Sequence, residues 1–174
     1  TLMPIATSLA LCIAIEKILK INVKLKWPND VTLKGKKVAG VLTDASIISN
    51  QIESMVLGIG INFKINPYEL ENSIKKTPNF YGVTTLVKKN ESMVPLIKQF
   101  LYELENVLKL INSLQIKKIR NEWTKRSSTI GKNISIITNN GRINGKAVKI
   151  DNDGGLVISN RKKTNRVLVG DVKE

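Results

Sequence analysis

The 174-residue sequence contains no histidine and a single cysteine, Cys12. The absence of histidine excludes imidazole general bases, histidine-ligated metal centres and the Ser-His-Asp triad. One cysteine cannot form a disulfide within the chain, and Cys12 lies in an apolar run, so a thiolate metal site and a disulfide-stapled secreted fold are also excluded. The composition therefore favours a cytoplasmic protein whose chemistry uses other side chains.

Acidic residues are scarce, with 14 Asp and Glu against 28 Lys and Arg and a net charge of +14. The excess is concentrated in the C-terminal third, because residues 115–174 carry 14 basic and 5 acidic residues. Such an excess is typical of nucleic-acid binding. However, only 5% of the residues are aromatic, and the longest basic run is Arg161-Lys162-Lys163. This pattern favours a solvated lysine-rich surface and disfavours base stacking.

One long apolar run opens the chain, from Leu2 to Ile15, interrupted only by Thr7 and Ser8. No basic segment precedes this run and Glu16 follows it, which disfavours a signal peptide. At about 14 residues the run is too short to span a bilayer. We therefore predict a helix buried on most of its faces, and no membrane partner.

The next residues alternate between apolar and polar side chains, which predicts strands packed on the first helix as an antiparallel meander. The predicted strands are 22–27, 31–33, 37–43 and 52–63. Residues 64–90 are predicted to be loops with a short helix, and two helices follow, over 92–111 and 116–125. The predicted apolar stripe of the first of these helices is Leu96, Ile97, Phe100, Leu101, Leu104, Leu108 and Ile111.

In the last third of the chain, short segments typical of strands alternate with turn residues. The expected strands are 133–138, 143–150, 156–159 and 166–169, with turns at 139–141 and 151–155. This spacing predicts a small β-barrel module. The fold class is therefore α+β, with a domain boundary near residue 128.

Three segments carry the candidate chemistry. Lys26-Trp27-Pro28-Asn29-Asp30 places a lysine on the polar face of a strand just before a rigid turn, which gives the ammonium group a defined direction. Lys37-Val38-Ala39-Gly40-Val41-Leu42 has small residues inside a strand, where a ligand can approach closely. Gly58-Ile59-Gly60-Ile61-Asn62 places two glycines and an asparagine on one strand face and leaves a trough. Taken alone, Lys26 is more simply an exposed lysine, and a single G-x-G is a weak signal.

In this order and spacing, the three segments resemble the catalytic domain of biotin–protein ligases, the biotin–[acetyl-CoA-carboxylase] ligases. Trp123 and the segments Ile130-Gly131-Lys132 and Gly170-Asp171-Val172 are similar to the C-terminal SH3-like domain of that family. The resemblance implies a class II aminoacyl-tRNA synthetase/biotin ligase-like domain over 1–127, with a mixed or antiparallel sheet packed on helices. It implies a small SH3-like β-barrel over 128–174.

The resemblance also implies an enzyme with two half-reactions. Biotin and Mg-ATP would give biotinyl-5′-AMP, and the biotinyl group would then pass to a lysine of the biotin carboxyl carrier protein. Lys26 matches the family's catalytic lysine, which would contact both biotin and the adenylate, and Asn62 would contact the phosphate or its Mg²⁺. The residues implied to line the biotin site are Lys26, Ala39, Gly40, Gly58 and Gly60.

The family's Gly-Arg-Gly-Arg-type loop is expected before the first helix, whereas the only Gly-Arg pair here is Gly141-Arg142. The resemblance thus implies an N-terminally incomplete catalytic domain, as a fragment of a longer protein or as a degenerate or split ligase, with a homodimer as one possible assembly. The alternative is an incomplete scaffold that acts as a basic module binding nucleic acid or an acidic partner. A lipoate or octanoate transferase would share the fold, but the Trp27-Pro28 pair disfavours it.

Overall fold

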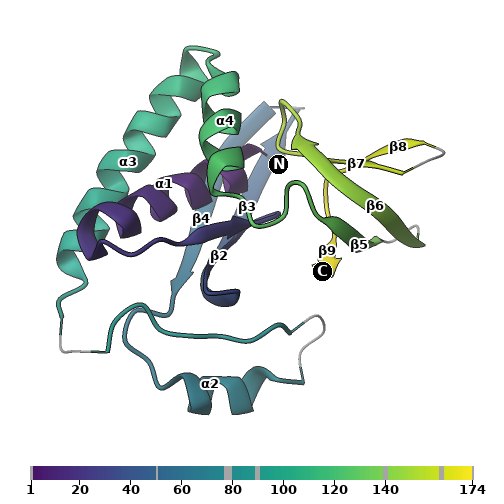
Figure 1. Ribbon diagram of the computed structural model, residues 1–174. Coiled ribbons are helices and arrows are strands. Elements are labelled where there is room, and N and C mark those ends of the chain that lie inside the picture. Colours follow the sequence, from purple (N-terminus) through teal and green to yellow (C-terminus); the bar gives the residue numbers. More distant parts are fainter. Residues whose placement is uncertain are drawn as a thin grey trace.

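The computed structural model of the chain describes residues 2–49, 51–76, 80–88, 91–138, 141–160 and 163–173. These residues form four helices and nine strands, and the strands make two antiparallel sheets (Figure 1). The predicted α+β class is therefore confirmed. The predicted turn at Asn139-Asn140 and the Arg161-Lys162 pair fall outside the described residues.

Helix α1 (Leu2–Leu19) lies at the centre of the core. Ten of its residues are buried, because α3 (Val94–Asn112), α4 (Ile116–Arg126) and the first sheet all pack against it. By length and composition alone, α1 is the one described helix that could cross a membrane. A helix that is apolar on all sides is also what a fully surrounded core position requires. The prediction of a buried helix is confirmed.

The first sheet is a meander of β1 (Lys24–Lys26), β2 (Asp30–Leu33), β3 (Lys36–Ile48) and β4 (Gln51–Ile61), in that spatial order. Leu25 and Val31 are completely buried on the face that packs against α1, whereas Lys24 and Lys26 point to the other face. Because α1 covers one face of the sheet, the face that carries Lys24 and Lys26 is the one on which a ligand could bind.

Helix α2 (Pro67–Ile74) begins after Asn66, whose side chain accepts a hydrogen bond from the Tyr68 N–H. The chain then returns to the first sheet. The Lys37 N–H donates to the Gly82 carbonyl at 3.0 Å and the Thr84 N–H donates to the Lys37 carbonyl at 2.9 Å. These two bonds hold the segment 80–84 beside the start of β3.

The second sheet contains β5 (Asn133–Thr138), β6 (Gly141–Ile150), β7 (Leu156–Ser159), β8 (Thr164–Val167) and β9 (Asp171–Lys173), in the order β8-β7-β6-β5-β9. The strand predicted over 166–169 is present as β8, shifted two residues earlier, whereas β9, by which the chain returns to pair with β5, was not predicted. A Cβ at Gly170 would lie 2.6 Å from Ile136 Cγ2, so glycine permits this close return. The SH3-like assignment and the boundary near 128 stay predictions.

The turn after Lys26 is held by the C-terminal part of the chain. The Trp27 indole N–H donates to the Gly154 carbonyl at 3.0 Å, and the Trp27 backbone N–H donates to Thr129 Oγ1 at 3.1 Å. The Ser128 N–H donates to the Leu25 carbonyl at 2.8 Å. Trp27 is only 1% exposed. Ser128, Thr129 and Gly154 therefore fix the strand end from which Lys26 projects.

Candidate functional site

Cross-strand pairing places Lys26 on the same face of the first sheet as two predicted site glycines. Lys26 pairs with Asp30, Asp30 with Gly40, and Gly40 with Gly60. Directly opposed residues share a face of a sheet. Neighbouring strands lie about 4.8 Å apart, so this row of four residues spans about 14 Å. We call the face that carries it the glycine face.

Open space lies above β4 on the glycine face. A Cβ at Gly60 would meet no heavy atom of the described residues within 4 Å, and one at Gly58 would meet Leu42 Cβ at 3.7 Å. Gly40 differs, because a Cβ there would lie 2.9 Å from Lys37 Nζ. The paired glycines of β4 therefore leave a flat surface that a ligand could cover, while Gly40 makes room for the Lys37 side chain.

Ala39 lies on the opposite face of the sheet. It is 2% exposed and belongs to the core, opposite Val31 and Ile61 in the neighbouring strands. Adjacent residues of a strand point to opposite faces. The expectation that Ala39 and Gly40 line the same pocket is therefore wrong, and the small Ala39 side chain lies where α1 packs on β3.

The Lys26 ammonium group lies in a cluster of charged and aromatic groups. Its Nζ lies 3.4 Å from the centre of the Tyr81 ring. The Tyr81 hydroxyl donates to Asp30 Oδ2 at 2.6 Å, and Asp30 Oδ1 lies 2.5 Å from Lys37 Nζ. These four residues, the Lys26 cluster, contain two cations and one carboxylate. The cluster therefore carries a surplus positive charge.

Sequence reasoning missed three of these four residues as members of a site. Tyr81 lies in the stretch 64–90, which has no periodicity, and nothing in its sequence surroundings indicates that it returns to β3. Asp30 and Lys37 stand in the quoted motifs, but their pairing depends on the register between β2 and β3.

Asn62 follows β4 and is held against the start of β3. Its Nδ2 donates to the Lys37 carbonyl at 3.2 Å, and its backbone N–H donates to the Val38 carbonyl at 2.7 Å. Asn62 and Lys26 line one cleft. The structure thus brings together the two residues predicted to contact a phosphate.

This cleft, of about 1020 Å³, opens between the turn after β1, the segment 80–83, α2 and the second sheet. Its size suits a nucleotide-sized ligand. Gly40, Gly58 and Gly60 are not among its lining residues, so the cleft meets the glycine face only at its Lys26–Asp30 end. The charged and polar residues near Lys26 in its lining are Asn29, Asp30, Lys37 and Asn62.

A second hollow, of about 740 Å³, shares Lys26, Phe80, Tyr81 and Val172 with the cleft. We call it the lysine groove, because six of its lining residues are lysines and none of the described residues in its lining is Asp or Glu. The six are Lys24, Lys26, Lys34, Lys75, Lys132 and Lys173. Clustered cations without carboxylates attract anions.

The described residues contain no group of three or more Cys, Asp or Glu that could hold a metal ion. Near Lys26, the oxygen-bearing side chains are those of Asp30 and Asn62. Mg²⁺ is commonly held by one or two protein oxygens together with phosphate oxygens. The residues present fit a Mg²⁺ ion that arrives with a phosphate ligand, and the Asn62 contact to it stays a prediction.

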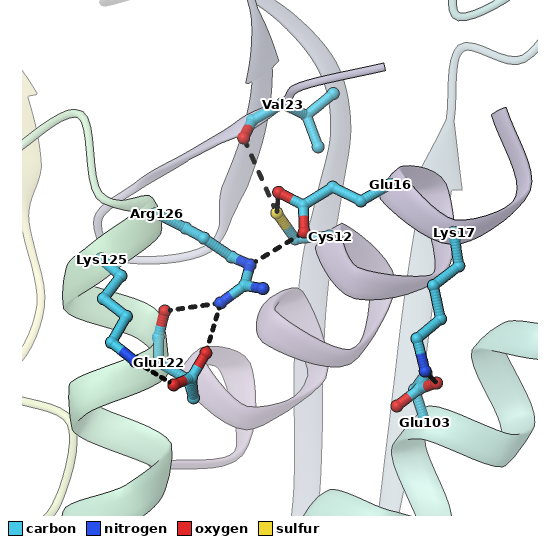
Figure 2. Close-up of polar contacts among 8 residues, drawn as sticks. All are labelled: Cys12, Glu16, Lys17, Val23, Glu103, Glu122, Lys125 and Arg126. Carbon is cyan, nitrogen blue, oxygen red and sulfur yellow. Dashed lines mark hydrogen bonds and ion pairs between the residues drawn. The ribbon is translucent and has the colours of Figure 1, made fainter. Parts of the chain in front are cut away.

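A second charged cluster, which we call the helix cluster, lies between α1, α3 and α4 (Figure 2). The Arg126 guanidinium donates to Glu16 at 3.0 Å and to Glu122 at 2.7 Å. Although burial disfavours the charged guanidinium, hydrogen bonds to these carboxylates raise the pKa of Arg126. The remaining pairs are Lys125 with Glu122 at 2.6 Å and Lys17 with the buried Glu103 at 2.8 Å.

Cys12 lies beside the helix cluster, and its thiol donates to Glu16 Oε1 at 3.9 Å (Figure 2). Burial raises the pKa of the Cys12 thiol to about 12, and the neighbouring Glu16 carboxylate adds to this effect. A thiol with such a pKa stays protonated at neutral pH, so it is a poor nucleophile.

A family model, the Biotin/lipoate A/B protein ligase family, matches residues 2–62, which include β1 to β4. The chain is 27% identical over 159 residues to the bifunctional ligase/repressor BirA of Bacillus subtilis, covering 91% of this chain and 48% of that protein. It is 29% identical over 136 residues to the biotin–[acetyl-CoA-carboxylase] ligase of Paracoccus denitrificans, covering 77% and 55%. The chain thus spans about half the length of these curated relatives.

Solved structures of the biotin protein ligase from Aquifex aeolicus have the same fold. The structure without ligand superimposes with a TM-score of 0.80 at 26% identity, covering 98% of this chain and 72% of that one. The structure in complex with biotin and ATP gives a TM-score of 0.77 at 26% identity, covering 98% and 69%.

Proposed function

From the membership of this chain in the biotin protein ligase family, we propose that it carries the site at which biotin is joined to ATP and passed to a carrier lysine. The acceptor would be the biotin carboxyl carrier protein of acetyl-CoA carboxylase, in the cytoplasm. The observation that carries the proposal is the position of Lys26, at one end of the row that leads to Gly60 and in the same cleft as Asn62.

The first step needs a fixed cation. A biotin carboxylate oxygen attacks the α-phosphorus of ATP, an O–P bond forms, and the bond from phosphorus to the bridging oxygen breaks to release pyrophosphate. Two anions must approach each other, so a preorganised ammonium group at their meeting point lowers the barrier. Lys26 supplies this group, and the surplus charge of its cluster makes the whole region favourable for anions.

The two substrates have separate surfaces available. The glycine face can take the flat biotin ring, because Gly58 and Gly60 leave open space above β4. The cleft that contains Asn62 can take the nucleotide, with its phosphate between Lys26 and Asn62. Holding both reactants in place accounts for a large part of catalysis in reactions of this kind.

In the second step, the neutral amine of the carrier lysine attacks the acyl carbon of biotinyl-5′-AMP. A C–N bond forms, the C–O bond to AMP breaks, and the attacking nitrogen loses a proton to solvent. Lys26 can stabilise the charge that develops on the carbonyl oxygen. This chemistry needs no protein nucleophile, which agrees with the absence of histidine and the protonated Cys12.

The test is biotin-dependent exchange of labelled pyrophosphate into ATP, followed by a streptavidin blot of a biotin carboxyl carrier domain. The 174-residue chain is compared with a fusion that adds the N-terminal part of the Aquifex aeolicus ligase. We expect little product from the chain and restored product from the fusion. If the fusion folds but neither binds biotin nor exchanges pyrophosphate, the proposal is wrong. Replacing biotin with lipoate or octanoate tests acyl selectivity in the same assay.

The lysine groove supports a second candidate, a basic module that binds nucleic acid or an acidic partner. Binding through phosphates weakens steeply as salt rises. A salt titration of oligonucleotide binding therefore separates the two functions, because affinity that hardly changes with salt contradicts the second candidate.

A further inference from the structure

We infer that Tyr81 is a positioning residue that holds the Lys26 ammonium group charged and in place. The enzymatic meaning of this inference rests on the proposed function, whereas the contact itself does not. Lys26 Nζ lies 3.4 Å from the centre of the Tyr81 ring, well within the distance of a cation–π interaction.

The Tyr81 ring is held at both ends. Its hydroxyl donates to Asp30 Oδ2 at 2.6 Å, and Asp30 itself is paired with Lys37. Its backbone neighbour Gly82 accepts a hydrogen bond from the Lys37 N–H at 3.0 Å. The Tyr81 side chain is therefore tied to the start of β2 and the neighbouring backbone to the start of β3, and the ring presents a fixed face to Lys26.

A fixed ring matters because a lysine side chain is long and flexible. Four carbons separate the ammonium group from the backbone, so strand direction alone does not define where the charge lies. The negative face of an aromatic ring attracts a cation and favours its charged form. Tyr81 thus restricts Lys26 Nζ to the boundary between the cleft and the lysine groove, which both include these two residues.

The described residues around Lys26 include one carboxylate and several cations. Asp30 pairs with Lys26 across β1 and β2 and is the one carboxylate among the described lining residues near it. Like charges disfavour the ammonium form of a lysine. The other cations that line the cleft or the lysine groove are Lys24, Lys34, Lys37, Lys75, Lys132, Arg166 and Lys173.

The direct test measures the reactivity of the Lys26 amine toward an acylating reagent as a function of pH, with mass spectrometry of the modified peptide. Tyr81→Leu removes the ring, and we expect the pKa of Lys26 to fall by about half a unit, or about threefold more neutral amine at a given pH. Tyr81→Phe keeps the ring, and we expect less than half of that shift. Tyr102→Leu, an exposed tyrosine on α3, is the control and should change nothing at Lys26.

A second measurement follows pyrophosphate exchange in the fusion that restores activity. We expect Tyr81→Leu to lower kcat about tenfold with a smaller change in the KM for biotin, and to move the alkaline decline of the rate to lower pH. Tyr81→Phe should recover most of the rate. If Tyr81→Leu leaves Lys26 reactivity unchanged in folded protein, the inference is wrong, even if exchange is observed. If the reactivity of Lys26 shifts as expected but neither the fusion nor any of its variants exchanges pyrophosphate, the proposed function is wrong and the inference about Tyr81 is supported.

Discussion

The two charged clusters of this protein differ in how their charges balance. The helix cluster contains three cations and three carboxylates, and its pairs join α1 to α3 and α4 (Figure 2). The Lys26 cluster contains two cations and one carboxylate, and it borders a cleft. Balanced pairs satisfy one another and hold elements together, whereas a net positive charge beside a cavity favours an anionic ligand.

The clusters also differ in where their residues come from. The residues of the helix cluster stand within helices, where long side chains reach neighbouring helices. The residues of the Lys26 cluster stand at the ends of β1, β2 and β3 and in the segment 80–84, where small changes in backbone position move the charge. We therefore expect substitutions in the helix cluster to change stability and those in the Lys26 cluster to change activity.

The largest expected effect follows from Lys26→Gln. In the fusion that restores activity, loss of the ammonium group should lower the rate of biotinyl-5′-AMP formation by about 100-fold, a magnitude typical of removing one stabilising group from a transition state. The melting temperature should change little, because Lys26 lies outside the hydrophobic core. Lys98→Gln, an exposed lysine on α3 that lines neither the cleft nor the lysine groove, is the control and should keep most of the activity. If both variants lose the same fraction of the rate, the effect comes from general surface charge and not from the position of Lys26.

Arg126→Met should have the opposite profile. It removes two ion pairs and leaves Glu16 and Glu122 with less compensation, so we expect a loss of about 2 kcal/mol in the free energy of unfolding. Urea denaturation measures this loss, and the activity of the fusion per folded molecule should stay constant. A stable variant with impaired adenylation would contradict the division between the clusters.

Gly60→Val tests the glycine face. A valine fits the open space above Gly60 and favours strand structure, so the melting temperature should not fall. Its side chain would occupy the surface assigned to biotin, and we expect affinity for biotin to fall about tenfold, or about 1.4 kcal/mol. Calorimetric titration measures the affinity. Ser54→Val, an exposed residue on the same face of β4, is the matched control, and a similar loss there would remove the assignment.

The smallest effect concerns Cys12. Its pKa is about 12 in the folded protein, against an ordinary value of 9.0 for a solvated cysteine thiol. Above pH 9 the unfolded thiol loses its proton while the folded one keeps it, so the folded state binds more protons and loses stability as pH rises. We expect the wild-type protein to lose about 1 kcal/mol per pH unit more than Cys12→Ala between pH 9 and 11. Parallel stability curves for the two proteins would show that burial does not raise the pKa of the thiol.

Local patterns predicted the elements well, but tertiary contacts decided which faces are buried. The predicted stripe of α3 included Ile97 and Leu101, which are exposed, and omitted Glu103, which is buried. Glu103 accepts hydrogen bonds from Lys17 of α1 and from Gln99, so a charged side chain is tolerated at the helix contact. No pattern within α3 reveals a partner 86 residues earlier in the chain.

The sequence by itself determined the alternation of β1 to β4, because side chains along a strand point to opposite faces whatever packs on them. It thereby determined that Gly58 and Gly60 share a face. Only the tertiary structure decided that Lys26 stands in the same row as Gly60, that Ala39 faces the core, and that Tyr81 lies against Lys26. The register between strands and the path of the segment 80–84 bring together residues that are distant in the chain. The free energy that fixes this register and this path comes from packing of the whole molecule.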